Sequence, residues 1–277
     1  MSASDDPTSR GFDAYAPRQI AARAEQVGIE KASLDALTML VLAVLAGAFI
    51  SLGAQLFAAV VTGSAFGFGP TRLLGGVGFS LGLVLVIAGG AELFTGNNLL
   101  TMAWASRKVT TRALLRNWAI VYVGNFLGAL GTVFIVFYSG VWRVGDGGIG
   151  STLVTIAAAK SSLGFVEATL RGVLCNALVC LAVWLCIGAR STVDKIAAIL
   201  LPISGFVACG YEHCVANMYF VPLGILVNGA TGERAAGLGW GAFFWSSLAP
   251  VTLGNVFGGA LMVGLVYWFV YLRPRRA

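Results

Sequence analysis

The sequence predicts an all-α membrane protein with six transmembrane helices. Of its 277 residues, 58% are hydrophobic and only 11% are charged, whereas soluble domains carry about 25% charged residues. The mean hydropathy is +0.85. Apolar runs long enough to cross a bilayer recur along the chain. The second and fifth runs are each interrupted by a carboxylate, and we expect a broken helix at both places.

The elements follow in order from these runs. Segment 1–32 is polar and has no apolar core of a secretory signal peptide. Its apolar residues Ile20, Ala24 and Val27 have helical spacing, which predicts an amphipathic helix on the cytoplasmic membrane face; a solvated leader is the alternative. The channel domain is then 33–277. Its predicted spans are 37–61, 73–106, 117–142, 172–189, 196–228 and 235–272, the start of the last being a loop or an interfacial helix.

An internal repeat supports the six spans. Two signatures recur in the same order in the ranges 33–142 and 165–272. They are Gly90-x-Glu92 with Asn97 and Gly210-x-Glu212 with Asn217, followed by Gly124-Asn125-x-x-Gly128 and Gly254-Asn255-x-x-Gly258. Each unit holds three spans, an odd number, so the second copy enters the membrane from the opposite side. Such an inverted repeat, with matching broken helices, predicts a site near the bilayer midplane.

Basic residues predict the orientation. The net charge is +6, but the Lys and Arg residues cluster between the apolar runs, so we interpret them as topology signals and expect no nucleic-acid partner. One side of the membrane collects thirteen of the eighteen and the other side five. The richer side should be cytoplasmic, which places both termini in the cytoplasm and the protein in the cell (inner) membrane.

Metal and disulfide chemistry is not expected. The five cysteines lie inside apolar runs without CxxC spacing, and His213 is the only histidine. Packing is the simpler interpretation of these thiols. We therefore predict no metal, no cofactor and no disulfide framework. An intramembrane enzyme would also need a second catalytic group, and neither GxSxG nor HExxH occurs.

The polar residues at the breaks are the candidates for structure and chemistry. Glu92 and Glu212 precede the breaks, where we expect them to cap or brace a loop; the four repeat asparagines should supply structural hydrogen bonds. They are Asn97, Asn125, Asn217 and Asn255. His213 is interpreted as functional, because ionisable groups within a membrane usually mark pathways or relays. The Thr95 hydroxyl is a candidate to face the pore.

Two further residues allow two interpretations each. Asn176, in the fourth span, either completes a polar patch with His213 and Thr95 or joins two helices. Lys160, before that span, is either an ordinary loop cation or an attractant for anions. The residues alone do not decide between these interpretations.

Four ordered motifs resemble one known family. The stretches GAELFTGNN (90–98), CNALVCLAVW (175–184), GYEHCVANM (210–218) and VTLGNVFGG (251–259) together look like the formate–nitrite transporters. The similarity runs over nearly the whole chain. It implies a homopentamer of aquaporin-like protomers, each with its own pore for small anions such as formate, nitrite or hydrosulfide.

The resemblance also implies roles for individual residues. His213 would be the pore histidine, Thr95 the threonine of the first break, Asn176 the asparagine of the fourth helix, and Lys160 the lysine of the outer vestibule. Two apolar constrictions would follow, formed by Phe79 and Phe206 on the outer side and by Leu83, Leu93, Phe94 and Val179 on the inner side. Arg171 is basic where some formate channels are apolar, so nitrite or hydrosulfide remain alternatives to formate.

A proton-linked mechanism follows as a hypothesis. Moving a carboxylate into low dielectric costs on the order of 20 kcal/mol, whereas a neutral acid avoids most of this cost. Lys160 and Arg171 would concentrate the anion, and His213 would supply or relay a proton. A membrane scaffold that transports nothing is the competing class, but it leaves the inverted breaks without a purpose. The lone histidine disfavours an ammonium transporter, and the absence of NPA motifs disfavours a water channel.

Overall fold

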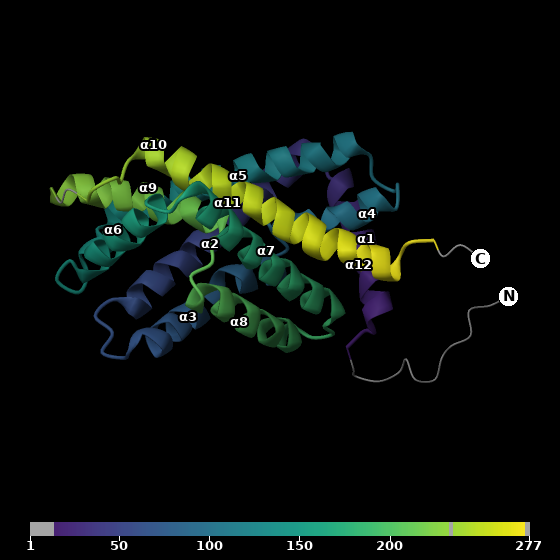
Figure 1. Cartoon of the computed structure of the whole chain (residues 1–277), viewed down its shortest axis with the longest axis horizontal. Helices are drawn as coiled ribbons and strands as arrows, with labels where there is room; N and C mark the ends of the chain where they lie inside the picture. The colour runs from purple at the N-terminus through teal and green to yellow at the C-terminus, as the bar shows by residue number, and fades with distance from the viewer. Residues whose placement is uncertain (1–13, 233–234, 275–277) are drawn as a thin grey trace.

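A computed structural model describes residues 14–232 and 235–274 (Figure 1). The first half contains α1 (Pro17–Ser33), α2 (Ala36–Val61), α3 (Phe68–Gly89), the 3-10 helix η2 (Gly96–Leu100), α4 (Thr101–Ala105), α5 (Thr111–Ser139) and η3 (Val141–Arg143). The second half contains α6 (Gly148–Ser161), α7 (Phe165–Gly188), α8 (Thr192–Ala208), α9 (Cys214–Thr231), α10 (Trp240–Ala242), η4 (Phe243–Leu248), α11 (Ala249–Val256), η5 (Phe257–Leu265) and α12 (Val266–Tyr271). The described residues contain no strand.

Six helical segments are long and apolar enough to cross a membrane, which confirms the predicted number. They are α2, α3, α5, α7, α9 and the continuous helix 240–271, in which η4 and η5 are π-helical turns. Figure 1 shows this last helix as one long diagonal ribbon whose end, α12, lies beside α1. The two ends of the described chain therefore lie at the same end of the molecule, as an even number of crossings requires.

The second and fifth helices are broken, as the sequence predicts. We call residues 90–95 the first break and residues 209–213 the second break. Gly90 ends α3 with φ of 70°, and Gly210 follows α8 with φ of 72°, a left-handed conformation that glycine adopts without a steric cost. The chain then resumes as η2 and α4 after the first break, and as α9 after the second.

The glycines of the second repeat signature bring two helices together in each half. A Cβ on Gly128 of α5 would lie 2.0 Å from the Val44 carbonyl oxygen of α2. A Cβ on Gly258 of η5 would lie 2.1 Å from the Val173 carbonyl oxygen of α7. Both distances exclude any side chain, so the backbones pack directly, as small residues allow in membrane helices.

α6 is an element that the sequence analysis missed. The sequence predicts no element between the third and fourth spans, and it allows Lys160 to be either a loop cation or an attractant for anions. In the structure, α6 ends at Ser161, just before α7, in the way that α1 ends at Ser33 just before α2. The helix is amphipathic only weakly and has 14 residues, too few for a span, so hydropathy alone did not reveal it. Each half therefore begins with a short helix.

α1 packs onto the body of the protein. Ile20, Ala21 and Ala24 are buried, in a cluster that includes Trp184 of α7 and Val263 of η5. α1 has the helical spacing of apolar residues that the sequence predicts. Its apolar face, however, contacts protein rather than a membrane surface or solvent. α1 also brings Lys31 to the first break, as α6 brings Lys160 to the second.

Candidate transport site

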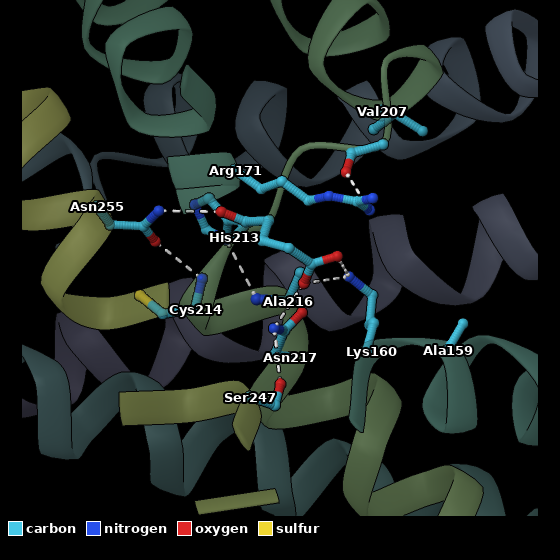
Figure 2. Close-up of polar contacts among 12 residues, drawn as sticks. Ala159, Lys160, Arg171, Val207, His213, Cys214, Ala216, Asn217, Ser247 and Asn255 are labelled. Carbon is cyan, nitrogen blue, oxygen red and sulfur yellow. Dashed lines mark hydrogen bonds and ion pairs between the residues drawn. The ribbon is translucent and has the colours of Figure 1, made fainter. Parts of the chain in front are cut away.

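Two asparagines hold the backbone of the two breaks with the same hydrogen bonds. The Asn125 side chain donates to the Ala43 and Glu92 carbonyl oxygens and accepts from the Phe94 N–H. The Asn255 side chain donates to the Gly172 and Glu212 carbonyl oxygens and accepts from the Cys214 N–H, as Figure 2 shows in part. Both side chains are fully buried. They satisfy backbone groups that a broken helix leaves open, where no water is at hand.

The carboxylates beside the breaks form equivalent ion pairs. Lys31 of α1 binds Glu92, which also accepts from the Asn97 amide. Lys160 of α6 donates to both oxygens of Glu212 at 3.0 and 2.9 Å, and Asn217 donates to the same carboxylate at 2.8 Å (Figure 2). The Glu92 and Glu212 backbone N–H groups donate to Leu42 and Arg171 carbonyls. Each carboxylate thus connects its break to the short helix of its own half.

His213 both caps a helix and reaches the opposite break. Its Nδ1 accepts the Ala216 N–H at 3.1 Å at the start of α9. Its Nε2 lies 2.9 Å from the Thr95 hydroxyl of the first break. Because Nδ1 accepts a hydrogen bond, it carries no proton in this arrangement, and the neutral ring donates from Nε2–H. A second proton would remove the cap and place positive charge at a helix N-terminus.

Asn176 joins the two halves at the same place. Its amide donates to the Asn255 carbonyl at 2.7 Å and to the Thr95 carbonyl at 3.3 Å. The Cys180 thiol also donates to the Thr95 carbonyl. We call Thr95, Asn176 and His213 the polar seam, because they connect the first break, α7 and the second break. All three side chains are buried.

A cavity lies on each side of the seam. The Lys160-side cavity is lined by His213, Lys160 and Arg72 together with an aromatic wall. In that wall, Phe79 meets Phe206 edge to face with ring centroids 5.6 Å apart, and Phe206 stacks on His213 at 6.1 Å. The cavity volume is about 50 Å³, and a single water needs about 10–15 Å³ by this measure. A solute of a few atoms therefore fits.

The Lys31-side cavity has the same volume, about 50 Å³. Its wall includes Lys31, Leu83, Leu93 and Asn97. It shares no lining residue with the Lys160-side cavity. The two cavities are therefore separate. Thr95 and Asn176 line neither of them, and His213 lines only the Lys160-side cavity.

The structure brings together most of the predicted site residues. Thr95 contacts His213, and the Asn176 amide donates to the Thr95 and Asn255 carbonyls, so Asn176 joins the two halves; its part in a polar transport site stays a prediction. Val179 is buried on α7 and lines neither cavity. The Phe94 ring does not point into the inner constriction, where the resemblance would place it. The ring packs on Tyr122 and Trp118, with centroids 4.9 and 6.2 Å away, and lines a groove outside both cavities.

Two cations near the cavities were counted only as topology signals. In the first half, Lys31 takes the place that Lys160 has in the second half. Extending the internal repeat to the short helix before each half would have identified Lys31 from the sequence. Arg72, at the start of α3, lines the Lys160-side cavity. Arg171, which was expected to attract anions, instead pairs with Glu167 and donates to the Gly210 carbonyl, outside the cavity lining.

Comparison with known proteins identifies the family. A family model described as formate/nitrite transporter matches residues 18–269. The chain belongs to the formate/nitrite transporter family. It is similar to the formate channel FocA of Escherichia coli K12, with 39% identity over 95% of this chain and 96% of that protein. It is also similar to a probable formate transporter of Methanothermobacter thermautotrophicus, with 40% identity over 88% of this chain and 92% of that one.

Solved structures of this transporter family have the same fold. A pentameric formate channel with formate bound has a TM-score of 0.79 and 40% identity, covering 86% of this chain and 98% of that chain. A second FNT family ion channel has a TM-score of 0.80 and 28% identity, covering 91% and 98%. Proteins of this family are channels or transporters and not enzymes, so this chain is a multi-pass membrane transporter.

Proposed function

We propose that this formate/nitrite transporter conducts formate, with nitrite and hydrosulfide as alternative substrates. The observation that carries the proposal is the pair of small cavities separated by the buried polar seam. The relatives named as formate channels, one of them solved with formate bound, favour formate over the alternatives. A scaffold without transport has no use for two cavities on opposite sides of a buried polar seam.

The apolar walls favour the neutral acid as the species that passes. A carboxylate entering low dielectric pays on the order of 20 kcal/mol, which protonation avoids. Phe79 and Phe206 on one side, and Leu83 and Leu93 on the other, supply such walls. The neutral His213 donates through Nε2–H toward Thr95, whose hydroxyl is then free to donate onward to a bound solute. In this proposal His213 orients the donor, and the proton linkage comes from the solute itself.

We also propose the assembly and the orientation. The solved relative is pentameric, and both cavities here lie within one chain, so each protomer would carry its own passage. The charge bias of the sequence places the Lys31 side, with both termini, in the cytoplasm and the Lys160 side outside the cell membrane.

The test is flux through the reconstituted protein. Purified protein in liposomes is exposed to formate, nitrite and hydrosulfide gradients at several pH values. Formate flux should exceed that of protein-free control liposomes and should rise as the pH falls. His213→Phe removes both the cap and the Nε2 donor, so flux should drop about tenfold, since leaving the buried Thr95 hydroxyl and Ala216 N–H without their partner costs about 1–3 kcal/mol.

A matched variant separates the two roles of His213. His213→Asn keeps an N-cap side chain but has no Nε2 donor. It should melt close to the unchanged protein while conducting as poorly as His213→Phe. If either variant keeps the original flux and pH profile, the histidine has no part in conduction. If no solute moves through the unchanged protein, the transport proposal itself fails.

A further inference from the structure

The Lys160-side cavity contains a second cation besides Lys160. Its charged lining residues are Arg72 and Lys160, and no carboxylate lines it. His213 is neutral in its hydrogen-bonded arrangement. The field that an anion meets in this cavity therefore depends on how far each of the two cations is already compensated.

Lys160 is compensated directly. Its ammonium group donates to both Glu212 oxygens, at 3.0 and 2.9 Å. The two side chains are 15% and 6% exposed, so water does little to separate their charges. From the cavity, an ion pair this close acts as a dipole whose attraction for an anion falls off faster with distance than that of a free cation.

Arg72 is not compensated in this way. None of the four ion pairs among the described residues includes it. Its Nη2 donates to the Val207 carbonyl at the end of α8, and its guanidinium lies 5.3 Å from the centre of the Phe57 ring. Its Nε is buried without an acceptor. Glu212 is near enough to act on Arg72 electrostatically, but it is bonded to Lys160 instead.

The chemistry of a guanidinium suits this cavity. Arginine stays charged, has five N–H donors and matches the geometry of a carboxylate or a nitrite ion better than an ammonium does. The single backbone acceptor at Val207 leaves donors available. Aromatic contact with Phe57 supports the guanidinium plane without neutralising it.

Arg72 also departs from the internal repeat. It lies twenty positions before Glu92, and the residue twenty positions before Glu212 is Thr192. Among the described residues, Lys31 is the only charged one that lines the Lys31-side cavity, and it is paired with Glu92. The uncompensated charge is therefore present at one mouth only.

We propose that Arg72 is the residue that recognises the anion at the Lys160-side mouth, whereas Lys160 neutralises Glu212 and braces the second break. The inference rests on the proposed transport function. It predicts that removing the Arg72 charge raises the anion concentration needed for half-maximal uptake from this side and leaves the maximal flux nearly unchanged.

The experiment compares uptake of formate by liposomes that contain the full-length protein, with the Lys160 side facing the added formate. The variants are Arg72→Gln, Arg72→Lys and, as a matched control, Arg143→Gln. Arg143 is an exposed arginine that lies over the Trp142 ring and lines neither cavity. Arg72→Gln should raise the half-saturating formate concentration about tenfold or more, the worth of a charged hydrogen bond. Arg72→Lys should recover most of this loss, and Arg143→Gln should change the half-saturating concentration less than twofold.

Salt gives an independent readout. Uptake at low formate should fall with ionic strength in the unchanged protein, because salt screens the attraction, and less so in Arg72→Gln. The proposal is wrong if Arg72→Gln has the same half-saturating formate concentration as Arg143→Gln. It is also wrong if Arg72→Lys is as impaired as Arg72→Gln and both melt earlier, since Arg72 would then only hold the Val207 carbonyl. Absence of flux in the unchanged protein would instead refute the transport function.

Discussion

At the scale of single residues, the hydrogen bonds of the seam determine what chemistry is available. His213 is the residue that the sequence singled out, and the structure gives its two nitrogens separate tasks. Nδ1 is occupied by the start of α9, and only Nε2 faces the seam. A free imidazole offers both nitrogens to a proton, so the constraint on this ring arises from the fold and was not visible in the motif.

Asn255 provides a residue-scale prediction about stability. Asn255→Ala leaves the Cys214 N–H and the Gly172 and Glu212 carbonyls without their partner. A buried group left unsatisfied costs about 1–3 kcal/mol, so the protein should melt markedly earlier in detergent. The matched control is Asn228→Ala, since Asn228 is half-buried and accepts from a single backbone N–H, that of Ala235. Equal melting of the two variants would show that Asn255 is dispensable for the second break.

At the scale of elements, direct backbone contact between helices fixes the two halves. α5 approaches α2 at Gly128, and η5 approaches α7 at Gly258, with no room for a side chain at either place. The short helices α1 and α6 add the lysines that compensate the carboxylates of the breaks. An element too short to span a membrane thus contributes as much to the site as the spans do.

Gly258→Ala tests the element-scale contact. The added methyl would lie 2.1 Å from the Val173 carbonyl oxygen, so α7 and η5 must separate. Overpacking of this kind costs about 1–3 kcal/mol or more. We expect a lower yield of monodisperse protein in size-exclusion chromatography and earlier thermal unfolding. Gly131→Ala, where nothing lies within 4 Å of the added Cβ, should behave like the unchanged protein. Normal behaviour of Gly258→Ala would mean that the helices do not rely on this approach.

At the scale of the whole molecule, the proposed passage belongs to a single chain. Every residue of the seam and of both cavities comes from one protomer. The chain mass is 28.8 kDa, and a pentamer like that of the solved relative would hold five independent passages.

Mixed assemblies test this independence. Unchanged protomers are co-expressed with tagged His213→Phe protomers, and assemblies of known composition are reconstituted. Formate flux should fall in linear proportion to the fraction of variant protomers, because each passage lies inside its own chain. A steep fall, in which one variant protomer silences the assembly, would indicate a path shared between chains.

The sequence predicted the spans, the breaks and the repeat asparagines, because these depend on local hydropathy and on spacing within the chain. It did not predict α6, the pairing of Lys31 with Glu92 or the direction of the Phe94 ring. Those features depend on contacts between distant segments, such as the 61 positions that separate Lys31 from Glu92. The cavity position of Arg72 likewise results from the packing of α3 against α8, which no local pattern records.

The equivalent construction of the two breaks has a consequence for how such a protein arises. Each half has a short helix that carries a lysine, an interrupted helix and a helix that carries an asparagine. The bonds of this lysine and this asparagine to the break lie within that half. A half-length ancestral chain that inserted into the membrane in both orientations would therefore have supplied this set of helices and bonds twice. The residues with the distinctive chemistry are those in which the copies differ: His213 stands opposite Leu93 in the repeat, Thr95 opposite Val215, and Arg72 opposite Thr192. The two halves thus share one framework, and the proposed selectivity depends on the positions at which they differ.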